Sequence, residues 1–130
     1  PGVLDASDAL AFVGSPGCGG TALFVGSVRS PDGGRPIEML EYEVWPERVG
    51  AELEAIAAEA LERFGAERAW IGHRTGPVAP GEASVVVAVS SAHRAEAFDA
   101  CRWAIDALKE RAPIWKREVA GAETRWVANT

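Results

Sequence analysis

The sequence is poor in cysteine, histidine and lysine, and it has no long apolar run. Two cysteines, Cys18 and Cys101, are too few for a disulfide framework or a zinc knuckle. Because His73 and His93 have no carboxylates at ligand spacing, we expect no metal site. No stretch approaches the roughly 20 apolar residues of a membrane helix, and no charged-then-apolar leader opens the chain. We therefore expect a cytoplasmic protein that does not act on membranes.

The charge argues against a further class of protein. With 13 bases against 19 acids, the formal net charge is −6, which disfavours broad nucleic-acid binding. The charge is uneven, because residues 38–67 hold nine acids and two bases, whereas residues 101–126 hold six bases and four acids. We interpret the acidic stretch mainly as a solvated helix face. A basic stretch within an acidic protein indicates a small anionic ligand rather than a polymer.

The chain of 130 residues is nearly half apolar, which predicts a single domain over residues 1–130. One helix is expected over Pro46–Phe64, with Pro46 in its first turn and Gly65 at its end. A second helix is expected from an N-cap at Ser90 or Ser91 to the stop at Pro113. Apolar residues at helical spacing form the buried faces of the two helices, namely Val49, Leu53, Ile56, Ala60 and Phe64, and then Phe98, Cys101, Ile105 and Leu108.

Short apolar or alternating runs between turn-rich segments predict strands. Strands and helices are interleaved, and some strands are adjacent, so we expect an α+β protein with two main helices packed on a mixed, mainly antiparallel sheet. Residues 1–20 are expected to be loosely structured, with a short strand or turn near Ala9–Val13. The strands are predicted over Ala22–Val28, Ile37–Val44, Arg68–Arg74, Ala83–Ser90, Ile114–Val119 and Arg125–Val127.

His93 and Arg94 fall in the first turn of the second predicted helix. Free backbone N–H groups and the helix dipole favour an anion there and disfavour a cation. Arg94 at this place therefore indicates a bound anion. The alternative is a surface arginine paired with an acid, although Ala97 and Phe98, which follow at helical spacing, offer no carboxylate. The residues alone leave the two interpretations balanced.

Lysine is rarer than arginine, with two against eleven, and both lysines lie within eight residues. Unlike arginine, lysine loses its proton when its surroundings lower its pKa, so it serves as a base or nucleophile. A chain reversal at Pro113 would bring Lys109 and Lys116 within roughly 10 Å of each other. Partly shielded ammonium groups at that distance lower each other's pKa. Chance clustering and a surface Lys116–Glu118 pair remain the alternatives.

The length of the second helix sets a constraint on the site. Sixteen residues separate His93 from Lys109, which is about 24 Å of helix at a 1.5 Å rise. A small substrate cannot touch both residues in one copy of the chain. Either there are two sites, or a second copy supplies one of the residues. We predict a dimer with a composite site.

These segments together resemble the large, catalytic subunit of molybdopterin synthase, the MoaE family. The run Ser90-Ser91-Ala92-His93-Arg94 is followed by Phe98, and the stretch from Lys109 to Glu118 reads K-x-R-A-P-x-W-K-R-E. The similarity spans roughly residues 22–127. Its further pieces are Gly26-Ser27-Val28-Arg29, His73-Arg74 to Gly76, Pro80-Gly81-Glu82 and Arg125-Trp126-Val127.

The resemblance implies an α/β-hammerhead type of fold and a homodimer within a heterotetramer. Each large subunit would bind a small ubiquitin-like sulfur carrier, whose C-terminal Gly-Gly thiocarboxylate enters a pocket. Two sulfurs would pass to cyclic pyranopterin monophosphate and form the dithiolene of molybdopterin, which is a sulfurtransferase reaction. No metal or organic cofactor is implied. The rival hypothesis is a non-catalytic α+β module that binds a phosphorylated metabolite.

The resemblance also implies roles for individual residues. Lys109 and Lys116 match the catalytic positions and suit proton transfer and stabilisation of developing negative charge. Arginine forks suit phosphate and pterin oxygens, and a histidine orients substrate or moves protons. His93 and Arg94 would come from the second copy. The implied substrate-binding residues are Arg29, His93, Arg94, Arg117 and Glu118.

Overall fold

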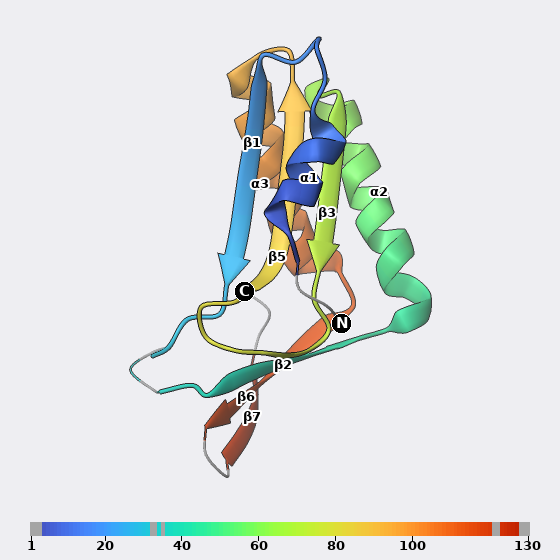
Figure 1. Cartoon of the computed structure of the whole chain (residues 1–130). Coiled ribbons are helices and arrows are strands. Elements are labelled where there is room, and N and C mark those ends of the chain that lie inside the picture. Colours follow the sequence, from blue (N-terminus) through green and yellow to red (C-terminus); the bar gives the residue numbers. More distant parts are fainter. Residues whose placement is uncertain (1–3, 32–33, 35, 121–122, 128–130) are drawn as a thin grey trace.

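The computed structural model describes residues 4–31, 34, 36–120 and 123–127. In this part of the chain, helices cover a first sheet, and a second sheet extends beyond one end of the first (Figure 1). None of the described helices is long and apolar enough to cross a membrane. The elements are α1 Ala6–Val13, β1 Gly20–Ser27, β2 Met39–Val44, α2 Pro46–Phe64, β3 Arg68–His73, β4 Gly76–Val78, β5 Ala83–Ser91, α3 Arg94–Arg111, β6 Ile114–Ala120 and β7 Glu123–Val127.

The first sheet has the order β1-β5-β3, and both ladders are antiparallel. Helices α2 and α3 cover one face, and α1 lies on the other (Figure 1). Successive residues of a strand point to opposite faces. Val85, Val87 and Val89 therefore pack towards α2 and α3, whereas Val86 and Ala88 pack against α1. Burial on both faces explains why β5 is an almost unbroken apolar run.

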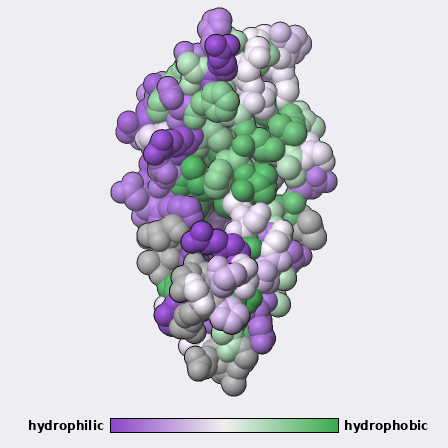
Figure 2. Space-filling view, turned by 90° about the vertical axis from the view of Figure 1, so that its left-hand side faces the viewer, coloured by the Kyte–Doolittle hydropathy of each residue, from purple (hydrophilic) through white to green (hydrophobic). Residues whose placement is uncertain are grey.

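Strand β1 forms the edge of the first sheet, since in the described residues it pairs only with β5. Leu23, Phe24 and Val25 on this strand are exposed, and so is Phe98 on the neighbouring α3. Seen from the β1 side, the surface carries an apolar patch (Figure 2). An exposed, apolar edge strand is unusual, because such edges pair readily with other chains.

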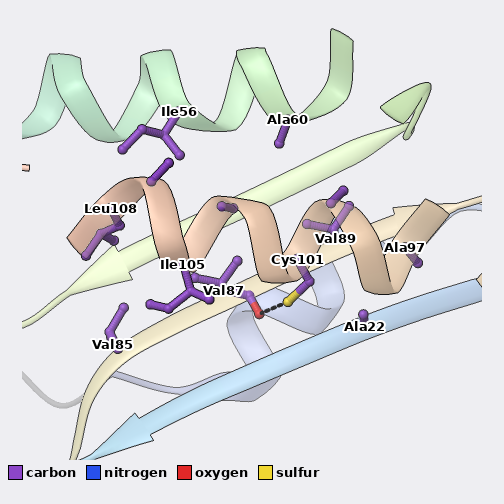
Figure 3. Packing of buried hydrophobic residues seen from close by; sticks show 13 residues of the cluster. Ala22, Ile56, Ala60, Val85, Val87, Val89, Ala97, Cys101, Ile105 and Leu108 are labelled. Atoms are coloured by element: carbon purple, nitrogen blue, oxygen red, sulfur yellow. Dashed lines mark hydrogen bonds between the residues drawn. The ribbon is translucent and has the colours of Figure 1, made fainter. Parts of the chain in front are cut away.

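The main core lies between the first sheet and helices α2 and α3 (Figure 3). Ile56 and Ala60 of α2 and Leu108 of α3 belong to this core, and all three are fully buried. The Cys101 thiol donates to the carbonyl oxygen of Val87 at 3.6 Å. Burial raises the pKa of Cys101 to about 11, so this thiol is a packing group and not a nucleophile at neutral pH.

The second sheet has the order β4-β2-β6-β7 and is also antiparallel. The chain turns from α3 into β6 at Pro113, whose carbonyl oxygen accepts from the backbone N–H of Trp45 at 3.0 Å. Trp45 is the N-cap of α2, and Pro46 opens that helix as predicted. This bond ties the start of α2 to the end of α3. The small core of this sheet consists of Val28, Ile37, Leu40, Tyr42, Val78 and Ile114.

The α+β class is confirmed, with four differences in the layout of the described residues. The elements form two sheets and not one, no ladder is parallel, and Gly76–Val78 forms a strand that is not among the predicted ones. A third helix, α1, stands where we expected a loose segment with a strand or turn. It forms because the Asp5 carboxylate accepts from the backbone N–H of Ser7 at 2.9 Å as a cap, and because Ala9 and Val13 are buried against the sheet.

The N-cap predicted for the second helix is wrong. Ser90 and Ser91 are buried in β5, because their backbones pair with Thr21 and Gly20 of β1. The N-cap is His93, which makes no side-chain capping bond. Phe98 was expected on the buried face, but it is 64 % exposed at the β1 edge. The other expected core residues of this helix, Cys101, Ile105 and Leu108, are buried.

Candidate active site

The two lysines lie on either side of the turn at Pro113. Lys109 is in the last turn of α3, Lys116 is on β6, and both are half-buried. Burial and the positive charge of Lys116 lower the pKa of Lys109, and Asp106 opposes the shift. The structure thus brings the two amines within electrostatic range, as the chain reversal predicts.

His73 and Tyr42 complete this cluster from two further strands. In the register of the second sheet, Tyr42 on β2 lies directly opposite Lys116 on β6. The rings of Tyr42 and His73 are edge to face, with centroids 4.9 Å apart. Burial lowers the pKa of His73, the hydrogen bond to Arg74 opposes this, and the charges of Lys109 and Lys116 lower it further. Three strands (β2, β3 and β6) and one helix (α3) therefore contribute side chains to one group of titratable residues.

Glu118 lies on the same face of β6 as Lys116, two residues further along, and its side chain is almost fully buried. Its carboxylate accepts from Arg125 on β7 at 2.8 Å. The described ion pairs therefore place it with Arg125 and not with Lys116. Arg125 thus holds this buried carboxylate two residues along the strand from Lys116.

Arg117 points to the opposite face of β6, away from Lys116. It donates to the Glu41 carboxylate at 2.6 Å, and its guanidinium lies 5.5 Å from the Trp126 ring centroid. The structure therefore does not bring Arg117 together with the lysines. The alternation of side chains along a strand already separates neighbours in this way.

Arg29 is exposed and follows the end of β1. The backbone of Val28 before it is fixed, since its N–H donates to Glu82 and its carbonyl oxygen accepts from Gly81. Strand β1 and helix α3 run in the same direction (Figure 1). Arg29 therefore leaves the first sheet at the end where Lys109 lies.

His93 and Arg94 are exposed at the opposite end of α3. A Cβ on Gly20 would lie 3.0 Å from the Cα of Arg94, so the start of β1 packs closely on the start of this helix. Within the described ranges, no carboxylate forms an ion pair with either residue, so the expected alternative of a surface pair is not found. Helix α3 is continuous from Arg94 to Arg111, and one copy of the chain cannot bring Arg94 to the lysines.

A groove of about 410 Å³ lies beside the exposed edge of β1 and reaches Lys109. It runs between β1 and α3, and Lys109 lies among its lining residues. Its wall is mostly apolar, as the patch on this face indicates (Figure 2). The lining residues are Ala22, Leu23, Phe24, Phe98, Cys101, Arg102, Ile105, Asp106 and Lys109.

Sequence reasoning gave no role to His73 or Tyr42, which the structure places beside the lysines. A signal was present, because alternation along β3 puts His73 on the same face as Ala69 and Ile71, towards α2 and α3. The pairing of β2 with β6, which places Tyr42 opposite Lys116, could not be predicted from the sequence. That pairing joins segments more than 70 residues apart.

Comparison with known protein families identifies the family of the chain. The family model described as MoaE protein matches residues 2–111 of the chain. The chain belongs to the MoaE family. A relative in Pyrococcus abyssi, named molybdopterin synthase catalytic subunit, is 42 % identical over 127 residues, which cover 98 % of this chain and 86 % of the relative. The lysine cluster thus lies in a chain of the MoaE family.

Solved structures of MoaE-like proteins have the same fold. The structure of molybdopterin synthase from Staphylococcus aureus superposes with a TM-score of 0.92 at 32 % identity and covers 96 % of this chain and 91 % of that one. A chain from the complex of subunits 1 and 2 of molybdopterin-converting factor from Helicobacter pylori superposes with a TM-score of 0.72. It is 23 % identical, covers 85 % of this chain and 73 % of that one, and shows the fold alone.

Proposed function

We propose that this MoaE-family chain is the catalytic subunit of a molybdopterin synthase. It transfers two sulfurs from the C-terminal thiocarboxylate of a small carrier protein to cyclic pyranopterin monophosphate. The observation that carries the proposal is the Lys109–Lys116 pair beside a groove, in a chain whose relatives are named for this activity. The proposed location is the cytoplasm.

The chemistry needs cations whose protonation can change. A thiocarboxylate and a phosphate are both anionic, so an ammonium group attracts them and stabilises negative charge that develops on the reacting atoms. Because burial and Lys116 lower the pKa of Lys109, this lysine exchanges its proton nearer to neutral pH than a free lysine does. Arginine supplies the charge but not the proton transfer.

A homodimer with a composite site is part of the proposal. If β1 pairs antiparallel with β1 of a second copy, the two α3 helices lie side by side in opposite directions. His93 and Arg94 of the second copy then lie at the end of the groove where Lys109 stands. The unpaired edge of β1, its exposed apolar residues and the length of α3 support this arrangement.

The assay for the function supplies the chain with a thiocarboxylated carrier and the pterin precursor, and measures formation of the dithiolene product. We expect product in this mixture and none when the carrier lacks its thiocarboxylate. The rival hypothesis, a non-catalytic module for phosphorylated metabolites, predicts binding of the precursor without product. No observation in the structure favours the rival hypothesis.

The dimer arrangement predicts that Phe98→Asp produces a monomer. Phe98 lines the groove and is mostly exposed, so the single chain should still fold after the substitution. In a dimer, however, each introduced carboxylate would be buried against the apolar surface of the other copy, which is unfavourable. Light scattering should report the single-chain mass of 13.7 kDa in place of twice that value.

Phe12→Asp is the matched control for this variant. Phe12 is also exposed, but it lies on α1, which covers the other face of the first sheet. We expect the control variant to remain dimeric. Dissociation by Phe12→Asp together with an intact Phe98→Asp dimer would place the interface elsewhere.

A further inference from the structure

A second cleft lies at the Pro113 turn, where α3 ends and β6 begins. It shares no lining residue with the groove between β1 and α3. Side chains alternate along β6, so Trp115 points to the face opposite Lys116. The proposed function therefore gives this cleft no role. We call it the tryptophan cleft; its volume is about 230 Å³, and its lining residues are Trp45, Arg48, Glu52, Arg111, Pro113 and Trp115.

Two exposed indole rings contribute to the wall of the tryptophan cleft. Trp45 is 46 % exposed and Trp115 is 51 % exposed. The backbone of both residues is fixed, because the N–H of Trp45 donates to the Pro113 oxygen at 3.0 Å, and Trp115 pairs with Glu43 in the ladder of β2 with β6. Exposed tryptophans on a fixed backbone are typical of the anchors of protein interfaces, since they bury a large apolar area at a small cost in entropy.

Arg48 gives the tryptophan cleft a positive charge. Its guanidinium lies 5.0 Å from the centroid of the Trp45 ring. Glu52 follows four residues later, at the spacing of a helical ion pair, but its carboxylate accepts from Arg111 at 2.9 Å. In the ranges that the structure describes, no carboxylate forms an ion pair with Arg48. This exposed cation is therefore complementary to an acidic group of a ligand.

The size of the tryptophan cleft favours a protein segment over a metabolite. Sites for small molecules usually measure about 300–1,000 Å³, whereas this cleft of about 230 Å³ has room for one or two side chains. Proline-rich segments bind in grooves lined by aromatic rings, because their extended backbone is already ordered before binding. Two indoles and the ring of Pro113 supply such a surface.

We propose that the tryptophan cleft binds an extended segment of another protein in which prolines flank an acidic residue. The prolines pack on Trp45 and Trp115, and the acidic side chain pairs with Arg48. Arg111 is already held by the carboxylates of Glu52 and Glu59, so it braces the wall of the cleft and leaves the charge of the ligand to Arg48. This inference goes beyond the proposed function and does not rest on it.

Indole signals of the unaltered chain locate the binding. The chain has five tryptophans, so ¹⁵N-labelled protein gives five indole N–H signals, and Trp45→Phe and Trp115→Phe assign the two from the cleft. The probe is the synthetic peptide Ala-Pro-Pro-Glu-Pro-Ala. At up to about 1 mM, we expect it to shift the signals of Trp45 and Trp115 and to leave those of Trp70, Trp103 and Trp126 in place. Unshifted signals from the two cleft tryptophans would overturn the proposal.

Substitutions measured by fluorescence anisotropy with the labelled peptide test the two parts of the cleft. We expect Trp115→Ala and Arg48→Ala each to weaken binding about tenfold or more, the effect of removing an interface anchor. Trp126→Ala is the matched control, because Trp126 is 54 % exposed and also lies against an arginine, Arg117, but it is not among the lining residues. Thermal melting checks the fold, and if Trp115→Ala does not fold, the exposed Arg48 still carries the test. Equal affinities in Arg48→Ala and the control would contradict the proposal.

Reversed charges and a peptide without proline test the chemistry of the ligand. Arg48→Glu should lose the acidic peptide and bind Ala-Pro-Pro-Lys-Pro-Ala more tightly than the wild-type chain does. Ala-Ala-Ala-Glu-Ala-Ala should bind the wild type about tenfold more weakly than the proline peptide, and equal binding of the two would overturn the proposal. So would a shift of the two cleft signals that depends on protein concentration without peptide, because a second copy of the chain would then occupy the cleft. None of these measurements involves sulfur transfer, so the proposed function stands or fails separately.

Discussion

Replacing Lys109 or Lys116 with alanine is expected to lower the rate of sulfur transfer by about 10²–10⁴-fold, the usual contribution of a positioned proton-transfer or charge-stabilising group. Each substitution removes one of the two amines that meet at the turn after α3. Both side chains are only half-buried, so the fold should survive. Single-turnover rates with a preformed thiocarboxylate carrier measure the effect directly.

Arginine at the same positions distinguishes charge from proton transfer. Lys109→Arg keeps a cation but removes an amine whose pKa is lowered by burial and by Lys116, because arginine stays protonated. We expect it to recover less than about a tenth of the wild-type rate. Thermal melting of each variant serves as the control for folding. Near-normal turnover in Lys109→Ala or Lys116→Ala would remove that lysine from the mechanism.

Arg94→Ala is expected to lower kcat/KM by about 10²-fold, although Arg94 begins α3 at the end remote from Lys109 in the same chain. The reason is the composite site, in which Arg94 of one copy binds the anionic substrate beside the lysines of the other. Arg94 is exposed and no described carboxylate pairs with it, so its loss should leave stability unchanged. Steady-state kinetics at several precursor concentrations test this.

Arg63→Ala is the matched control for Arg94→Ala. Arg63 lies on α2, is not among the residues that line the groove, and pairs with Glu59 at 3.0 Å on the surface. Its removal changes the net charge by the same amount, so a general effect of charge would appear in both variants. Equal losses in Arg94→Ala and Arg63→Ala would point to long-range steering and not to a contact with substrate.

Local patterns predicted the elements that carry the site. Pro46 and Gly65 bound α2 as expected, and the turn at Pro113 brings Lys109 and Lys116 together because it reverses the chain between a helix end and a strand. Arg94 was predicted to lie in the first turn of the second helix, and it is the first residue of α3. These features depend on neighbours in sequence, which is why they were predictable.

The features that were missed depend on pairing between distant segments. Ser90 and Ser91 have the chemistry of an N-cap, but the ladder with β1 extends β5 through both of them. Phe98 fits the apolar spacing of α3, yet it is exposed beside β1, the edge strand of the first sheet. The spacing of apolar residues along a helix does not distinguish a buried position from an exposed apolar one. Arg125, the partner of Glu118, likewise follows from strand register, and the contact between His73 and Tyr42 joins strands of two different sheets.

The central claim is that the site is shared between two copies of the chain, and mixing two inactive variants tests it most directly. Lys109→Ala and Arg94→Ala proteins are each expected to be nearly inactive alone. After they are unfolded together and refolded, half of the dimers contain one chain of each kind, and one of their two sites has neither substitution. The mixture should therefore recover about a quarter of the wild-type activity. A mixture no more active than its separate components, with mixed dimers confirmed by native mass spectrometry, would contradict a shared site.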